Sequence, residues 1–368
     1  MHAAGGFRGS IDLGYNQMLT MAQTGIHSGL VLNGGRFGEY LGVETALGFS
    51  TPIQELEILQ SGCAVCDLNW RALINVTGKD RVRWLHNMVT NNVRDLQVNR
   101  GAYNFVLNAR GRILGDLNVF NRGESLLLET DRNQVETLLA TLRRFIIMDK
   151  VELVDLGSGI TAVGIAGPNS EHVLVSAGMN VSGMQPLEIR DQTIDEGAVQ
   201  IIRGAEQKPN WFEIWMDAAN APAVAKKLME CGAQPVGAEA LEMWRVLRGI
   251  PQYGKDIRDR DLPQETGQMQ ALNFNKGCYI GQEIVERIRS RGQVHRNFRG
   301  FEFAGSAPSL GKFESEGRSI AEITSVARVP GAGGEREIAL GYVRVEAVPE
   351  NGLLSLNGTQ ARIVNLPF

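Results

Sequence analysis

The stretch that most constrains this chain covers residues 275–299, NKGCYIGQEIVERIRSRGQVHRNFR. It places one cysteine, Cys278, between Gly277 and Gly281, and glycines allow the backbone to turn tightly or to approach a ligand closely. Lys276 is the nearest cation in the sequence, and a nearby cation favours the thiolate form of cysteine. Cys278 and Lys276 are therefore candidate catalytic residues. The ordinary alternative for Cys278 is a small buried hydrophobic group.

The segment after Glu283 alternates between two kinds of residue. Arg287, Arg289 and Arg291 fall on one side of an extended chain, and the residues between them fall on the other. This period of two predicts a strand that carries a basic stripe. Such a stripe is either a solvated strand face or a docking surface for an acidic partner.

The composition limits which classes of protein this chain can belong to. The chain has 368 residues, of which 43% are hydrophobic and 21% charged, and this is enough for two or three globular domains. A net charge of −4 gives no support to nucleic-acid binding. We find no apolar run of about 18 residues, so we expect no membrane span. The first residues do not resemble a secretory signal, so we expect a cytoplasmic protein.

The four cysteines are too few for a disulfide framework in a chain of this length. Cys63 and Cys66 form a CxxC pair, which could be redox-active or half of a metal site. No second pair completes a zinc site, because Cys231 and Cys278 stand alone. We therefore expect Cys63 and Cys66 to pack in the core, and we expect no metal site.

The order of secondary structure predicts an α+β protein. Period-two segments predict strands at 71–76, 102–107, 112–120, 125–130 and 151–156, with helices after residues 80 and 131. Strands and returning helices over 161–231 predict a ferredoxin-like layer. Short alternating runs beyond residue 299 predict a small antiparallel barrel or sandwich. The sequence has no Walker loop and no Gly-rich dinucleotide fingerprint, which disfavours a nucleotide-binding domain.

The segment KGCYIGQE, together with the basic segment after it, resembles the signature of the YgfZ-like proteins. These are folate-binding relatives of the glycine-cleavage T-protein, an aminomethyltransferase. The segments VTGKDRVRWLHNMVTNNV (76–93) and YGKDI (253–257) are also similar to T-protein patterns. The resemblance implies a three-domain arrangement around a central folate site. The implied domains are a T-protein-like folate-binding domain (1–156 plus 235–298), a ferredoxin-like domain (157–234) and a C-terminal β-barrel (299–368).

The resemblance also implies which residues would hold tetrahydrofolate or a one-carbon derivative: Asp116, Glu213, Arg245 and Tyr253. Without the resemblance, Asp116 would be interpreted as a strand-surface carboxylate and Arg245 as a solvated helix-face cation. For Glu213, a strand-surface carboxylate and a ligand acceptor are equally open. T-proteins often carry two adjacent aspartates where this chain has Gly115 and Asp116.

The function implied by the resemblance is tetrahydrofolate binding in support of iron–sulfur cluster assembly or repair. Cys278 would be the reactive or sulfur-handling group, and assembly or client proteins would be partners. A second possibility is an aminomethyltransferase that acts on a lipoyl-bound aminomethyl group, against which Gly115 and the KGC segment argue. A third is a non-catalytic scaffold whose basic stripe, 287–299, docks an acidic partner.

Overall fold

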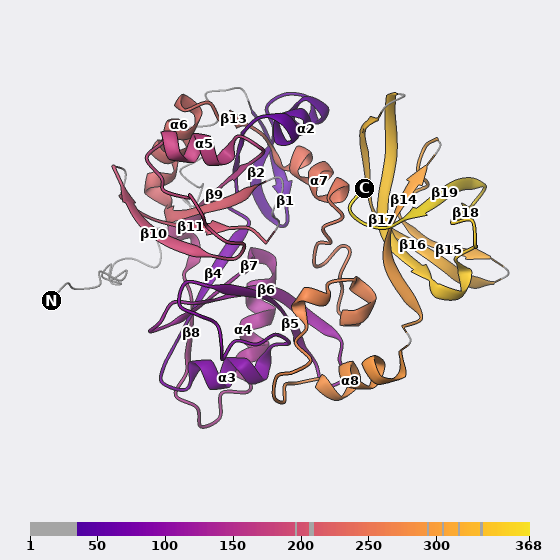
Figure 1. The fold of residues 1–368 in the computed structure, drawn as a ribbon, viewed down its shortest axis with the longest axis horizontal. Coiled ribbons are helices and arrows are strands. Elements are labelled where there is room, and N and C mark those ends of the chain that lie inside the picture. Colours follow the sequence, from indigo (N-terminus) through magenta and orange to yellow (C-terminus); the bar gives the residue numbers. More distant parts are fainter. Residues whose placement is uncertain are drawn as a thin grey trace.

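The structure is a computed structural model that describes residues 35–195, 197–205, 210–292, 294–303, 305–315, 317–331 and 334–368. Three larger sheets meet around helix α7, Ala238–Leu247 (Figure 1). A small hairpin pairs β1, Arg36–Tyr40, with β2, Val43–Gly48. Within the described ranges, no helix is long and apolar enough to cross a bilayer.

The first sheet is antiparallel, with strand order β5-β6-β7-β4-β8. Its strands are β4 (Arg71–Thr77), β5 (Gly101–Leu107), β6 (Ile113–Asn121), β7 (Leu126–Asp131) and β8 (Glu152–Asp155). Helices α3, Arg81–Met88, and α4, Val135–Arg143, bury apolar side chains against one face. In β6 the residues alternate between buried and half-buried, as expected for a strand with two different faces. The strands predicted from period-two patterns are confirmed here.

The second sheet has strand order β10-β11-β12-β9-β3-β13. Its strands are β3 (Ala64–Asp67), β9 (Ile160–Ala166), β10 (Ile189–Ile194), β11 (Gly197–Arg203), β12 (Trp211–Asp217) and β13 (Gln234–Pro235). Helices α5, Ser170–Ser176, and α6, Ala221–Glu230, bury apolar side chains in the core of this unit. Strand β3 lies outside the segment 157–234, so this sheet is wider than a layer built from that segment alone.

The third sheet is C-terminal and antiparallel, with strand order β15-β16-β17-β14-β19-β18. Its strands are β14 (Arg296–Phe303), β15 (Gly311–Ser315), β16 (Arg318–Gly331), β17 (Gly334–Arg344), β18 (Leu353–Leu356) and β19 (Thr359–Val364). Among the described residues, the end strands β15 and β18 pair only with their inner neighbours. The strands therefore form a curled half-barrel, and the expected arrangement of a separate C-terminal barrel domain stays a prediction.

The basic segment after Cys278 is helix α8, Gln282–Arg291, so the prediction of a strand is wrong. Gly281 precedes the helix and Gly292 follows it, with φ of 81° and 71°, values that favour glycine. Val285 is fully buried, and Ile284 lies against Gly111. Apolar residues at 284, 285 and 288 fit a helical repeat as well as an alternation. Over so short a segment, the pattern could not separate helix from strand.

Helix α7 holds the three sheets together through one central hydrophobic cluster. The cluster contains Trp244 of α7, Phe120 of the first sheet, Trp215 of the second and Phe298 of the third. The N-terminus of α7 has no side-chain cap of its own. Instead, the buried carboxylate of Glu55, in α2 (Pro52–Ser61), accepts a hydrogen bond of 2.7 Å from the backbone N–H of Gly237.

Glu55 also accepts hydrogen bonds from the backbone N–H groups of Phe49 and Ser50, at 2.5 and 2.6 Å. Three backbone donors therefore depend on this one carboxylate. We predict that Glu55→Ala lowers the melting temperature by roughly 5 °C, since the buried Gly237 donor left unpaired costs about 1–3 kcal/mol and two half-exposed bonds are also lost. The matched control is Glu57→Ala, because Glu57 is exposed on the same helix. Equal melting temperatures for the two variants, measured by differential scanning calorimetry, would contradict this account of α7.

Candidate functional site

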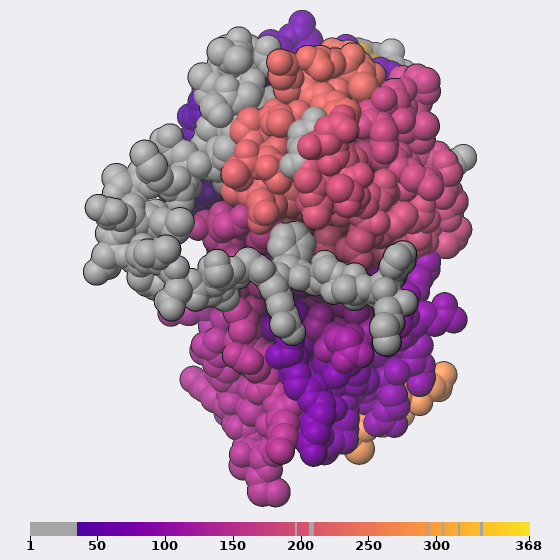
Figure 2. Space-filling view, turned by 90° about the vertical axis from the view of Figure 1, so that its left-hand side faces the viewer, coloured from indigo at the N-terminus to yellow at the C-terminus, as the bar shows by residue number. Residues whose placement is uncertain are grey.

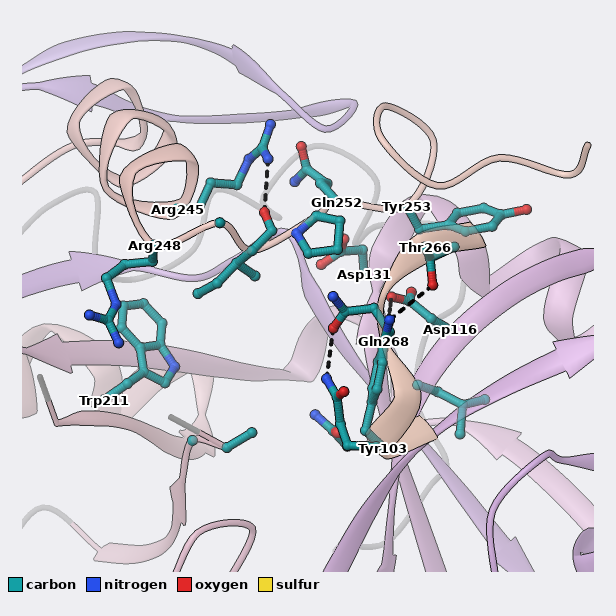
Figure 3. Close-up of a pocket in the computed structure, with 18 of the residues that line it drawn as sticks. Tyr103, Asp116, Asp131, Trp211, Arg245, Arg248, Gln252, Tyr253, Thr266 and Gln268 are labelled. Atoms are coloured by element: carbon teal, nitrogen blue, oxygen red, sulfur yellow. Dashed lines mark hydrogen bonds between the residues drawn. The ribbon is translucent and has the colours of Figure 1, made fainter. Parts of the chain in front are cut away.

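A cavity of about 990 Å³ lies between the first sheet, β12, α7 and the C-terminal sheet. All four residues expected to contact a folate line it: Asp116, Glu213, Arg245 and Tyr253. Figure 3 shows Asp116, Arg245 and Tyr253 around the same space, although they come from β6, α7 and the segment after α7. Lys276 and Cys278 are not among the residues that line this cavity.

Asp116 sits at the sheet side of the cavity with both carboxylate oxygens engaged. Its Oδ2 accepts a hydrogen bond from the Tyr103 hydroxyl at 2.6 Å, and its Oδ1 accepts one from Gln134 Nε2 at 2.8 Å. Burial raises the pKa of Asp116 above its ordinary value; the hydrogen bond from Tyr103 opposes the rise, and the charge of Asp131 adds to it. Such a carboxyl can act as an acceptor for a ligand N–H or, when protonated, as a donor.

Gly115 precedes Asp116 in β6 and faces the other way. A Cβ at Gly115 would lie 2.7 Å from a methyl group of Leu138, which belongs to α4. Because successive side chains of a strand point to opposite faces, position 115 faces the helix while Asp116 faces the cavity. A second aspartate at position 115 would therefore collide with α4 and would not add a carboxylate to the cavity.

Glu213 lies in β12 and is only 7% exposed. Its Oε2 accepts a hydrogen bond from Trp215 Nε1 at 2.9 Å, and its Oε1 accepts one from Trp211 Nε1 at 3.3 Å. The ring of Trp211 stacks on Trp244 of α7, with centroids 5.6 Å apart and an interplanar angle of 25°. Two indole donors therefore fix the carboxylate, and each oxygen retains lone-pair capacity for a ligand.

A buried group of charges beside Asp116 was not anticipated from the sequence. Arg71 of β4 forms ion pairs with Glu129 and Asp131 of β7, the latter at 2.5 Å. Arg71 and Asp131 are direct cross-strand partners in this antiparallel pair. In the sequence, the signal for this group is that charged residues occur in β4 and β7, which are otherwise largely apolar. All three side chains line the cavity, so its sheet side carries more acidic than basic groups.

Arg245 is buried, and its five N–H donors are all occupied. Its Nε and Nη2 bond both carboxylate oxygens of Glu242 at 2.7 and 2.6 Å. Its Nη1 donates to Asp256 at 2.7 Å and to the Ile250 carbonyl at 3.0 Å, and its Nη2 donates to Ser325 of β16 at 2.8 Å. A guanidinium has only five N–H donors. Arg245 therefore lines the cavity without a spare donor for a direct hydrogen bond to a folate, which is the role that the resemblance implies.

Tyr253, Arg248 and Arg299 also line the cavity. Arg248 follows α7, and Arg299 lies in β14 of the C-terminal sheet. Burial raises the pKa of Tyr253 to about 12, and the charge of Asp116 adds to this rise. Tyr253 therefore stays a neutral hydroxyl at physiological pH.

The side chains of Lys276 and Cys278 lie in different environments. Lys276 is buried, and its Nζ donates to the backbone carbonyls of His86, Val89 and Asn91 at 2.5, 2.6 and 2.7 Å. Burial lowers the pKa of Lys276 to about 7, and the charge of Arg94 adds to this fall. Cys278 is exposed. The ammonium is thus directed to backbone carbonyls and is not a partner for the thiol.

Cys63 and Cys66 are both free and buried. Cys63 packs into the core of the second sheet, whereas Cys66 packs into the central cluster around α7, so the two side chains lie on opposite faces. Burial raises the pKa of the Cys63 thiol to about 12 and holds the pKa of Cys66 well above its ordinary value. Their packing role agrees with the sequence expectation. A search of the described residues finds no group of His, Cys, Asp or Glu that could hold a metal ion.

These environments predict different thiol reactivities. In the folded protein at neutral pH, we expect iodoacetamide to label Cys278 at least about tenfold faster than Cys63 or Cys66, because buried thiols are inert. Mass spectrometry of tryptic peptides measures each rate separately. All four cysteines should label after unfolding in guanidinium, which is the control. Labelling of Cys66 at the rate of Cys278 in folded protein would contradict the packing described here.

Comparisons with known proteins agree with this architecture. The family described as the GCVT N-terminal domain matches residues 26–276. An aminomethyltransferase of Rubrobacter xylanophilus is 27% identical over 343 residues, which cover 91% of each chain. A chloroplastic protein of Arabidopsis thaliana, whose name provisionally calls it a transferase, is 24% identical over 318 residues, or 86% of this chain and 72% of that protein.

The crystal structure of the glycine cleavage system aminomethyltransferase T from Bartonella henselae has a TM-score of 0.83 to this structure, at 22% sequence identity. The match covers 93% of this chain and 96% of that one, which shows a shared T-protein fold. The T-protein relationship expected from the sequence is confirmed, and the narrower YgfZ-like assignment stays a prediction. Because the family match spans more than half of the 368 residues, this chain belongs to the GCVT N-terminal domain family.

Proposed function

We propose that this protein binds tetrahydrofolate, or a one-carbon derivative of it, in the central cavity. The observation that carries the proposal is that Asp116, Glu213, Arg245 and Tyr253 line one cavity although they are far apart in the chain. The cavity volume of about 990 Å³ lies at the upper end of the range for sites that enclose a small-molecule ligand. A folate therefore fits the available space.

The charges around the cavity support a ligand with a donor-rich head and an anionic tail. A pterin edge presents an amino group beside ring N–H groups, and a carboxylate such as Glu213 can accept two such hydrogen bonds at once. Asp116 would offer a further acceptor or donor to the same ring. Arg248 and Arg299 also line the cavity, and guanidinium groups suit the glutamate carboxylates of a folate. In this arrangement Arg245 positions the wall and does not hold the ligand.

We further propose a role in iron–sulfur cluster assembly or repair, as the resemblance of KGCYIGQE to the YgfZ-like signature implies. Cys278 is exposed and is not part of the cavity lining, which suits a thiol that acts on a partner protein and not on the bound folate. All four cysteines are free, which fits the reducing cytoplasm that we propose as its location.

Aminomethyl transfer from a lipoyl carrier to tetrahydrofolate is the second candidate. Relatives named aminomethyltransferase match 91% of this chain. The absence of an aspartate at position 115 no longer counts against this activity, because that position faces α4. Assay of 5,10-methylene-tetrahydrofolate formed from an aminomethyl-lipoyl protein separates the two candidates. We expect no formation above the rate without enzyme, and robust turnover would favour the transferase.

The folate proposal predicts a specific loss of affinity. Wild-type protein should bind 5-formyltetrahydrofolate with micromolar affinity in a calorimetric titration. Glu213→Ala should weaken binding by roughly ten- to a hundredfold, because loss of a charged hydrogen-bond partner costs about 1.5–3 kcal/mol. The matched control is Asp217→Ala, since Asp217 is an exposed acid on the same strand. If the wild type binds no reduced folate, the proposal is wrong and a non-catalytic scaffold becomes the better account.

The thiol proposal predicts that cellular function and folate binding separate. In a strain that lacks this protein, we expect Cys278→Ser to fail to restore iron–sulfur enzyme activity while it keeps wild-type folate affinity and melting temperature. Cys231→Ser should restore activity, because this half-buried thiol lies in the α6 region. Full rescue by Cys278→Ser would remove the thiol from the mechanism and leave the folate site unaffected.

A further inference from the structure

The side chain of Lys276 links the KGC segment to Asn91, which lines the central cavity. A lysine ammonium has three N–H donors, and Lys276 uses them on three backbone carbonyls that lie 185–190 positions earlier in the chain. Its Nζ also lies 5.0 Å from the centroid of the Tyr279 ring, which adds a cation–π contact. These hydrogen bonds and the ring contact hold the ammonium in place, and only 8% of the residue is exposed.

The three carbonyls belong to the last turn of α3 and to the segment that follows it. His86 lies in the last turn of α3, and Val89 and Asn91 continue the chain toward β5. A cation at the C-terminal end of a helix interacts favourably with the unpaired carbonyls there. Lys276 therefore contributes three hydrogen bonds to the chain as it leaves α3.

The segment held by Lys276 forms part of the cavity wall. Asn91 lines the cavity, and its Nδ2 donates to the backbone carbonyls of Tyr103 and Gln270 at 3.1 and 2.8 Å. Thr90 donates to the Ala271 carbonyl at 2.6 Å and accepts from the backbone N–H of Phe105 at 2.9 Å. A shift of this segment would move β5 and the 268–271 segment with it.

Tyr103 extends the same connection to Asp116. Its hydroxyl donates to Asp116 Oδ2 at 2.6 Å, and both residues line the cavity. A continuous set of hydrogen bonds thus runs from Lys276 through Asn91 and β5 to the carboxylate that faces the cavity. Figure 3 shows Tyr103 beside Asp116 at the end of this path.

We infer that Lys276 is a positioning residue of the central cavity: its ammonium fixes the Val89–Asn91 backbone and, through Asn91 and Tyr103, the wall that would hold a folate. The inference deepens the proposed function and rests on it where folate affinity is concerned. It also gives the KGC segment a second role, because Lys276 is anchored in the wall while Cys278, two residues later, is exposed.

Calorimetric titration with 5-formyltetrahydrofolate tests the affinity part of this inference. We expect Lys276→Met to weaken binding by about tenfold, because the charged donors are lost and the wall loosens. Lys276→Arg keeps a cation with several donors and should stay within about threefold of the wild type. The matched control is Lys79→Met, an exposed lysine just before α3. Folded Lys276→Met protein with wild-type affinity would overturn the inference, since a purely structural lysine would lower only the melting temperature.

Hydrogen–deuterium exchange of the ligand-free protein tests the wall itself and separates this inference from the folate proposal. In Lys276→Met, amides at 89–93 and 103–105 should exchange faster, while amides of β16 should exchange at the wild-type rate. Unchanged exchange at 89–93 would overturn the inference whatever the folate result. If Lys276→Met does not fold, Thr90→Val replaces it, because it removes the hydroxyl bond to Ala271 and leaves Lys276 intact. Wild-type exchange at 103–105 and wild-type folate affinity in Thr90→Val would then contradict it.

Discussion

The buried guanidinium of Arg245 joins three parts of the chain that must meet before the central cavity can form. It connects α7, the Ile250–Asp256 segment and β16 of the C-terminal sheet through five hydrogen bonds. Removal of one partner from a buried charge network leaves an uncompensated charge, which costs far more than the network contributes as a whole. These bonds tie the side of the cavity next to the C-terminal sheet to α7.

The sequence predicted the parts of this fold that follow from local periodicity. In the first sheet, β6 alternates between its two faces and its position was predicted correctly, whereas the short apolar pattern at 284–288 fitted both a strand and a helix. The resemblance to T-proteins selected four residues that line one cavity. The roles of Lys276 and Arg245 could not be predicted, because their partners are backbone carbonyls and side chains distant in sequence.

The cavity and the exposed Cys278 thiol lie in separate places and are connected by the segment that carries Lys276. Asp116 and Glu213 face the cavity, while Cys278 is exposed on the segment that leads into α8. In the side view of Figure 2, the residues of the second sheet lie above those of the first sheet. Lys276 belongs to the Cys278 segment and holds the cavity wall. This connection through Lys276 matters for function only if folate binding and partner binding change each other's affinity.

The central claim is that the cavity lined by Asp116 and Glu213 is a reduced-folate site. A crystal structure of the protein grown with 5-formyltetrahydrofolate tests it most directly, because it locates the ligand and its orientation together. The account predicts a pterin ring within hydrogen-bond distance of Glu213 and a glutamate tail directed toward Arg248 or Arg299. A folate bound elsewhere, or a cavity without ligand at saturating concentration, would contradict it.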